Sequence, residues 1–175
     1  MEETLPKRKP LRMSHYDYSA PGAYFLTFCT HNRKPFLSRI VGAIHESPQT
    51  QLTDCGRIVQ EIIENLPDHL PVTIDQFVIM PNHIHLIAAI TEEDMQRAIR
   101  ESPLRSRSVM SKLIGYIKMN GSKAIRRRCG DMTVWQRGYY DHVIRNKEDY
   151  LALAEYIQTN PLRWELDKLY EKEEI

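Results

Sequence analysis

Cysteine is scarce in this chain of 175 residues, and no two cysteines lie close together in the sequence. Cys29, Cys55 and Cys129 form no CxxC pair, which argues against a disulfide framework or a cysteine-rich zinc site. No apolar run approaches the roughly 20 residues of a membrane helix, and residues 1–13 lack the apolar core of an export signal. We therefore expect reduced thiols, no membrane partner and a cytoplasmic location.

An excess of charge of one sign is also missing, because 24 Lys and Arg residues nearly balance 23 Asp and Glu residues. The balance hides an asymmetry. Residues 97–128 contain ten basic residues and one acidic residue, whereas residues 165–175 are mainly acidic. A local basic block in a near-neutral chain indicates a patch for a polyanion. A solvated helix face would have the same composition, so charge alone leaves both interpretations open.

The chain has no internal repeat and no low-complexity tract, and its length suits a single domain. The hydrophobic fraction of 42% is ordinary for a globular protein. We divide the chain into a basic N-terminal arm (residues 1–20), one domain (residues 21–164) and an acidic C-terminal tail (residues 165–175).

Residue patterns predict an alternation of strands and helices. Aromatic and β-branched residues indicate strands at 23–30, 72–80, 84–90 and 133–144, the last with a break near Gly138. Apolar spacing indicates helices at 54–66 and 109–128, and Asn146 is expected to cap a helix that ends before Pro161. The remaining expectations are a strand at 36–41 beside the first, a loop at 42–51, and a short helix followed by a mobile basic insertion in 91–108. This order predicts the α+β class: a two-layer ferredoxin-like sandwich with an antiparallel sheet and helices packed on one face.

Two histidines flank one apolar residue in the predicted strand that follows Pro81. Side chains alternate along a strand, so His83 and His85 project from one face, and Ile84 projects from the other. Two imidazoles on one face can bind a single metal ion. Histidines in strands also occur as ordinary hydrogen-bonded residues, and the spacing alone leaves that alternative open.

The last predicted helix carries a tyrosine and an asparagine four residues apart, which places Tyr156 and Asn160 on one face. A tyrosine hydroxyl can act as a covalent nucleophile, and an amide oxygen can coordinate a hard cation. The alternative is structural, with a tyrosine at the edge of the core and an asparagine that ends the helix before Pro161.

Several segments taken in order resemble the single-tyrosine HUH transposases. They are YDYSAPGAYFLTFCT (16–30), PNHIHL (81–86), WQRGYYDHVIRN (135–146) and EYIQTNP (155–161). The set is most similar to IS200-like transposase domains and to the transposases associated with repetitive extragenic palindromes (REPs). The resemblance extends over about residues 16–164.

The resemblance implies cleavage and rejoining of single-stranded DNA at hairpin-flanked sites. His83 and His85 would bind a divalent cation, Mg²⁺ or Mn²⁺, and Asn160 would be the third protein ligand. Tyr156 would attack phosphorus and form a 5′-phosphotyrosine. Asparagine at this ligand position, where IS200 proteins carry glutamine, favours the REP-associated branch. IS200-like proteins commonly form dimers, so a homodimer is expected.

Basic and aromatic side chains are the candidates for DNA contacts. Trp135, Tyr139 and Tyr140 could stack on bases, although packing in the core or in a hairpin is the favoured explanation for each of them. The basic candidates are Lys112, Lys123, Arg126 and Arg127 on one helix face, Arg105 and Arg107 in the insertion, and Lys7, Arg8, Lys9 and Arg12 in the arm.

Two alternatives compete with the enzyme: a non-cleaving protein that binds DNA hairpins, and a metal-stabilised RNA-binding module. All four active-site positions hold chemically competent side chains, which favours the enzyme.

Overall fold

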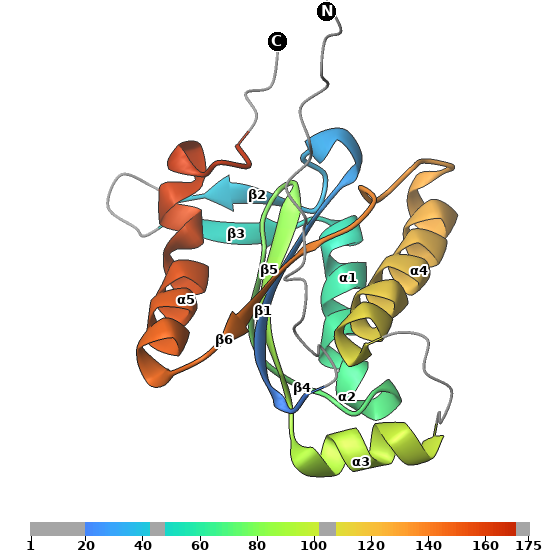
Figure 1. Ribbon diagram of the computed structural model, residues 1–175. Helices are drawn as coiled ribbons and strands as arrows, with labels where there is room; N and C mark the ends of the chain where they lie inside the picture. The colour runs from blue at the N-terminus through green and yellow to red at the C-terminus, as the bar shows by residue number, and fades with distance from the viewer. Residues whose placement is uncertain (1–19, 43–47, 102–107, 171–175) are drawn as a thin grey trace, which may run out of the picture.

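A four-stranded antiparallel sheet is the centre of the fold in a computed structural model that describes residues 20–42, 48–101 and 108–170 (Figure 1). The strand order is β4-β5-β1-β6, and each neighbouring pair is antiparallel. The strands are β1 (Gly22–Cys29), β4 (Thr73–Ile79), β5 (His83–Ile90) and β6 (Tyr140–Ile144).

Helices connect the strands in a β-α-β-β-α-β order formed by β1, α1, β4, β5, α4 and β6. This order and the strand arrangement are those of a ferredoxin-like fold, so the predicted α+β class is confirmed. None of the helices in the described ranges is long and apolar enough to cross a membrane. The helices are α1 (Asp54–Glu64), α2 (Leu66–His69), α3 (Glu92–Glu101), α4 (Val109–Cys129) and α5 (Lys147–Thr159), with short 3₁₀ helices η1 (His31–Arg33) and η2 (Asn160–Leu166).

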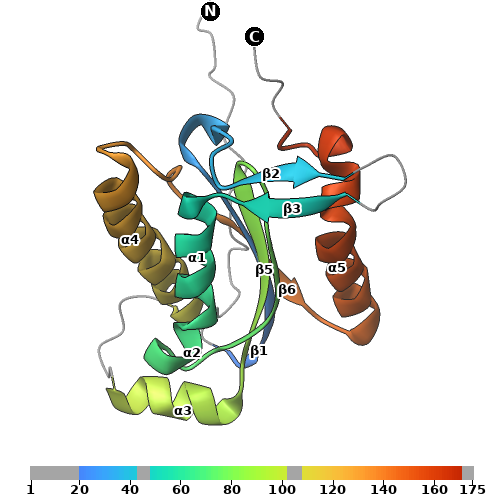
Figure 2. The same ribbon diagram turned by 180° about the vertical axis from the view of Figure 1, so that it is seen from behind.

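The sheet is covered on both faces, which corrects the expectation of helices on one face. In β1, Leu26 and Phe28 join the core beneath α1 and α4. Phe25 instead packs with Ala154 and Ile157 of α5 in a second core. Both views place α5 across the sheet from α1 and α4 (Figures 1 and 2). Alternation along β1 and β5 thus supplies two apolar faces, each of which needs its own helical cover.

A small second sheet lies beside the main one and pairs β2 (Ser38–Val41) with β3 (Gln49–Leu52). The expectation that residues 36–41 pair with the first strand was therefore wrong, and part of the predicted loop at 42–51 is a strand. This sheet leads into α1, whose N-cap Thr53 accepts a hydrogen bond from the Gly56 amide. A β-carbon on Gly56 would lie 2.0 Å from the carbonyl oxygen of Leu37, so no larger residue fits there.

The predicted helix of residues 109–128 is confirmed as α4, with an apolar side against the core and basic residues in its last turn. Gly121, on the apolar side, packs closely against the Trp135 ring, and a β-carbon there would lie 3.4 Å from Trp135 Cζ2. Two cysteines that are distant in sequence meet where α1 begins and α4 ends. The Sγ atoms of Cys55 and Cys129 lie 2.8 Å apart as free thiols.

Candidate metal centre and tyrosine site

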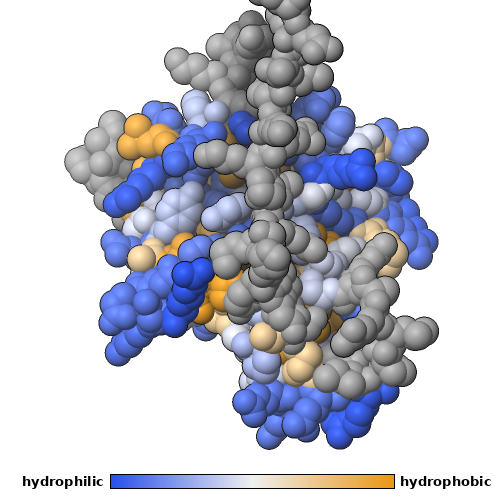
Figure 3. Space-filling model, in the orientation of Figure 1, coloured by the Kyte–Doolittle hydropathy of each residue, from blue (hydrophilic) through white to orange (hydrophobic). Residues whose placement is uncertain are grey.

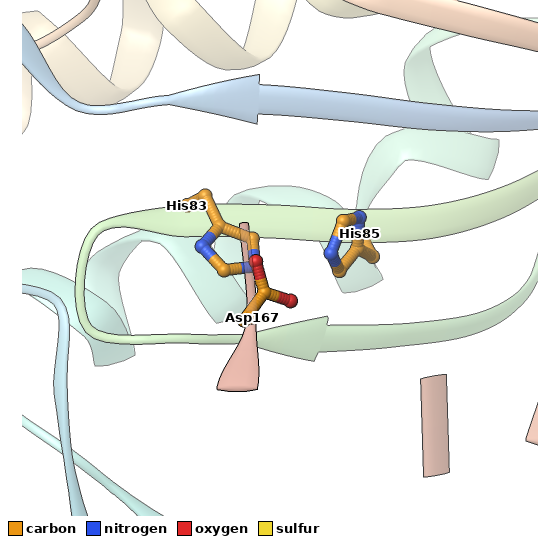
Figure 4. Close-up of side chains that lie close together, drawn as sticks. All are labelled: His83, His85 and Asp167. Atoms are coloured by element: carbon orange, nitrogen blue, oxygen red, sulfur yellow. The ribbon is translucent and has the colours of Figure 1, made fainter. Parts of the chain in front are cut away.

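The two histidines of β5 lie side by side on the sheet face that α5 covers. Their ring centroids are 4.5 Å apart, and the side chains of His83 and His85 are 0% and 3% exposed. Figure 4 shows both imidazoles projecting from the strand toward Asp167. The neighbouring Ile84 lies in the core on the opposite face, as the predicted alternation requires.

Hydrogen bonds orient both imidazoles through the same ring atom. The Nδ1 of His83 lies 2.8 Å from Asn82 Oδ1, and the Nδ1 of His85 lies 2.7 Å from Thr27 Oγ1. Each Nε2 is buried and has no hydrogen-bond partner within the described ranges. When Nδ1 carries the proton and donates it, Nε2 keeps the lone pair that a metal ion needs.

Burial keeps both imidazoles neutral near physiological pH. It lowers the pKa of His83 to about 4. Burial also places the pKa of His85 well below its ordinary value, and repulsion from His83 adds to this shift. Neutral imidazole is the form that binds metal ions.

Helix α5 brings Tyr156 of the same chain to the histidines. The helix begins at its Asn146 cap, as predicted, and packs Ile157 on the sheet. The Tyr156 ring meets the His85 ring edge to face with centroids 5.1 Å apart, and it remains 36% exposed. The tyrosine therefore reaches the histidines without a second chain.

A carboxylate that the sequence reasoning missed joins Tyr156 to Asn160. Asp167 Oδ2 accepts hydrogen bonds of 2.9 Å from the Tyr156 hydroxyl and from Asn160 Nδ2. The ligand atoms of His83, His85 and Asp167 lie within 4.8 Å of one another. Asp167 belongs to the segment assigned to an acidic tail, and no local pattern distinguishes it from the acidic residues around it.

Asp167 and Tyr156 shift each other's pKa in opposite directions. Burial raises the pKa of Tyr156 to about 12, and the nearby Asp167 carboxylate adds to the rise. Burial also acts to raise the pKa of Asp167, but the hydrogen bonds from the Leu169 amide and from Asn160 outweigh it, and the net shift is downward. At neutral pH the pair is a phenol that donates to a carboxylate.

The donor set fits a divalent metal ion. Two neutral imidazole nitrogens and one carboxylate face a common point, and the buried Oδ1 of Asn160 has no partner in the described part of the chain. Mixed nitrogen and oxygen ligands of this kind bind divalent cations. His83, His85, Asn160 and Asp167 are therefore the residues that could hold one.

The predicted DNA contacts on α4 lie away from this centre. Lys123, Arg126 and Arg127 are exposed on α4 and Lys112 is partly buried, but α4 covers the opposite face of the sheet. The structure thus joins Tyr156 to its expected partners and does not join the basic helix to them. The candidates Lys7, Arg8, Lys9, Arg12, Arg105 and Arg107 fall outside the described residues.

The candidate stacking aromatics differ in accessibility. Trp135 is 8% exposed, packs edge to face on Phe28 and donates its Nε1 proton to the Lys118 carbonyl, which is a structural role. Tyr139 is partly buried, and its hydroxyl lies 3.0 Å from Ser111 Oγ. Tyr140 is 50% exposed and remains available to a ligand.

Comparison with known proteins identifies the family. Residues 22–160 match the family described as "Transposase IS200 like". The chain belongs to the IS200-like transposase family. Among its relatives, an uncharacterized protein of Haemophilus influenzae is 37% identical over 93% of each chain. The REP-associated tyrosine transposase of Escherichia coli K12 is 25% identical over 86% of this chain and 74% of that protein.

A solved structure supports the same fold. The structure of a REP-associated tyrosine transposase bound to a REP hairpin matches with a TM-score of 0.59 and 23% identity, over 89% of this IS200-like chain and 77% of the other. The family match and the REP-associated relative together confirm the predicted resemblance to IS200-like and REP-associated transposases.

Proposed function

We propose that this transposase-family chain cleaves and rejoins single-stranded DNA at hairpin-flanked sites through a covalent bond to Tyr156. The observation that carries the proposal is the meeting of one exposed phenol with two oriented, neutral imidazoles in a single chain. A relative of the same fold is bound to a REP hairpin, which supports a hairpin as the DNA partner.

The residues divide the chemistry between them. A divalent cation, Mg²⁺ or Mn²⁺, held by His83, His85 and Asn160 with Asp167 as a further candidate, would polarise the scissile phosphate. Tyr156 attacks phosphorus, the bond from phosphorus to the 3′-oxygen breaks, and a 5′-phosphotyrosine and a 3′-hydroxyl result. Reversal of this step by a strand's 3′-hydroxyl rejoins DNA without ATP, because the tyrosine ester conserves the bond energy.

Tyr156 must lose its proton as it attacks, since its pKa of about 12 keeps it protonated at neutral pH. Asp167 Oδ2 already accepts a hydrogen bond from that hydroxyl at 2.9 Å and is therefore positioned to take the proton. The carboxylate also fixes the direction of the phenol oxygen, and phosphoryl transfer depends on in-line positioning of this kind.

Covalent trapping tests the proposal. Hairpin-bearing single-stranded DNA with Mn²⁺ should give an adduct that survives denaturation, and Tyr156→Phe should abolish it. Tyr116→Phe is the matched control, because Tyr116 lies on α4 and packs against the core on the opposite face of the sheet from the histidines. A mobility shift without any adduct would contradict cleavage and favour a hairpin-binding module. A preference for RNA would favour the metal-stabilised RNA-binding module.

A homodimer remains a prediction. The tyrosine and both histidines come from one chain, so dimerisation is not needed to assemble these catalytic groups.

A further inference from the structure

Two cysteines that the proposed chemistry does not use meet between α1 and α4. Cys55 lies in the first turn of α1, Cys129 is the last residue of α4, and their Sγ atoms are 2.8 Å apart. The S–S bond of a disulfide is about 2.05 Å long, so the two atoms need to approach by only about 0.8 Å to reach bonding distance. The pair is therefore close enough to be oxidised within one chain by a small movement of the helix ends.

The packing of the two helices holds these thiols together. Helices α1 and α4 lie side by side and run in opposite directions, so the start of one faces the end of the other (Figures 1 and 2). An ion pair of 3.1 Å joins Arg128 to Asp54, the residues that immediately precede the two cysteines. The same two helix ends thus meet through a charged contact and a sulfur contact.

The two thiols differ in their access to a reagent in solution. Cys129 is exposed, whereas Cys55 is only 7% exposed. Burial also raises the pKa of Cys55 to about 12, so this thiol stays protonated at neutral pH. Because the thiolate is the reactive form, an oxidant in solution reacts first at Cys129, and Cys55 reacts afterwards with its oxidised neighbour.

The surroundings of Cys129 favour a small anionic oxidant. Three exposed arginines, Arg126, Arg127 and Arg128, precede it in the last turn of α4. Figure 3 shows mainly hydrophilic surface at the upper right of the molecule, over the end of this helix. Peptide disulfides such as oxidised glutathione carry a net negative charge, and a cluster of arginines raises the local concentration of such an anion.

We propose that Cys55 and Cys129 form a reversible intramolecular disulfide, with a low-molecular-weight anionic disulfide as the oxidant. The Cys129 thiolate attacks one sulfur of the oxidant, a mixed disulfide forms, and the first thiolate of the oxidant leaves. Cys55 then loses its proton and attacks the Cys129 sulfur, which expels the second thiolate. The protein gives up two electrons and two protons, and these convert the oxidant into two thiol molecules. The reduced thiols expected from the sequence are the starting state.

The bond would stabilise the fold and leave the candidate metal centre unchanged. It would join residues separated by 74 positions, a segment that includes β4 and β5. Closing a loop of this length lowers the equilibrium constant of unfolding by up to about 10³-fold through the entropy of the unfolded chain. Because Cys55 belongs to the core beneath α1 and α4, the bond lies across the sheet from the histidines.

Thiol trapping in glutathione buffers tests the bond. The full-length protein is equilibrated with mixtures of reduced and oxidised glutathione, quenched with acid and alkylated, and the intact mass then counts the free thiols among the three cysteines. Oxidising mixtures should leave only Cys29 alkylated, and peptide mapping should find Cys55 linked to Cys129. Subsequent treatment with a reducing dithiol should restore all three free thiols.

Single substitutions test the order of the two steps. Cys55→Ser should stop at the mixed disulfide on Cys129. Cys129→Ser, at an exposed position, should leave Cys55 reduced because the oxidant cannot reach it. Cys29→Ser is the matched control and should oxidise as the unmodified chain does. Urea unfolding of the oxidised and reduced forms then measures the expected stabilisation.

Three results would overturn the proposal: three alkylated thiols in every oxidising mixture, a disulfide between two chains, or equal stability of the two redox forms in urea. The oxidised and reduced chains should form the Tyr156 adduct with DNA at the same rate, and a difference would contradict a purely stabilising bond. An adduct absent from both forms would refute the cleavage chemistry alone.

Discussion

Replacing Thr27 by valine tests whether the Thr27 hydroxyl prepares His85 for a metal ion. Valine keeps the shape and burial of threonine and removes only the oxygen that lies 2.7 Å from His85 Nδ1. The proton on Nδ1 would then have no acceptor, and the ring could transfer its proton to Nε2, the atom proposed to bind metal. We therefore expect weaker metal binding and a less stable apoprotein.

The magnitudes follow from the burial of this pair. An unsatisfied buried polar group costs about 1–3 kcal/mol, which lowers the melting temperature by about 2–4 °C per kcal/mol in a domain of this size. Loss of a hydrogen bond to a metal-binding histidine typically lowers metal affinity by about 10- to 100-fold. Urea unfolding of the apoprotein measures the first effect, and calorimetric Mn²⁺ titration measures the second.

Thr27→Ser is the matched control, because serine retains the hydroxyl and loses only a methyl group. It should keep near-normal Mn²⁺ affinity. Unchanged Mn²⁺ affinity in Thr27→Val would refute the argument that this hydrogen bond sets the state of His85. Equal losses in the valine and serine variants would refute it as well, since the methyl group would then be responsible.

Three further predictions concern other parts of the chain. Gly56→Ala should lower the free energy of unfolding by more than about 2 kcal/mol, because the new β-carbon would meet the Leu37 carbonyl. Gly115→Ala, which has open space around it on α4, should instead raise the free energy of unfolding by about 0.5–1 kcal/mol. Equal effects of the two variants in urea unfolding would contradict this. Burial lowers the pKa of Lys118 from 10.5 to about 8, so the folded state loses this proton at lower pH than the unfolded state. The free energy of unfolding, measured relative to that of Lys118→Met, should therefore rise as pH increases from about 8 to 10.5. A difference between the two proteins that does not change with pH would contradict this effect of burial. Asp167→Asn should lower the pKa of Tyr156 from about 12, as measured by ultraviolet titration of the phenol, and an unchanged pKa would show that the carboxylate has no influence there.

The histidine pair and the tyrosine helix could be predicted because each depends on local periodicity. Alternation along residues 83–85 fixes which side chains share a face, and a helical repeat fixes the relation of Tyr156 to Asn160. Neither pattern depends on the rest of the fold. The meeting of the two segments does depend on it, and the sequence supported that meeting only through resemblance to a family.

The side of the sheet that α5 covers was mispredicted, although the first strand carried a relevant signal. Residues 23–28 read AYFLTF, with a single polar residue, whereas a strand with one face in solvent alternates apolar and polar side chains. A nearly continuous apolar run indicates burial on both faces. Phe25 and Leu26 accordingly lie in different cores, and α5 covers the core that contains Phe25.

The partners of the histidines could not be predicted, because they arise from strand register and from a chain reversal. Thr27 meets His85 only because the register pairs these residues across 58 positions of sequence. Asp167 meets Tyr156 only because the chain turns back through η2. Periodicity carries no information about contacts of this kind.

The C-terminal segment and the histidine face of the sheet form one hydrogen-bonded unit, and Asn82 is the residue that joins them. Its Oδ1 lies 2.8 Å from His83 Nδ1, while its Nδ2 donates to the Leu169 carbonyl at 2.8 Å. Two residues before Leu169, Asp167 accepts from Tyr156. A displacement of this segment would therefore disturb both the imidazole proposed to bind metal and the phenol proposed to attack, since the orientation of each depends on the same short stretch of backbone.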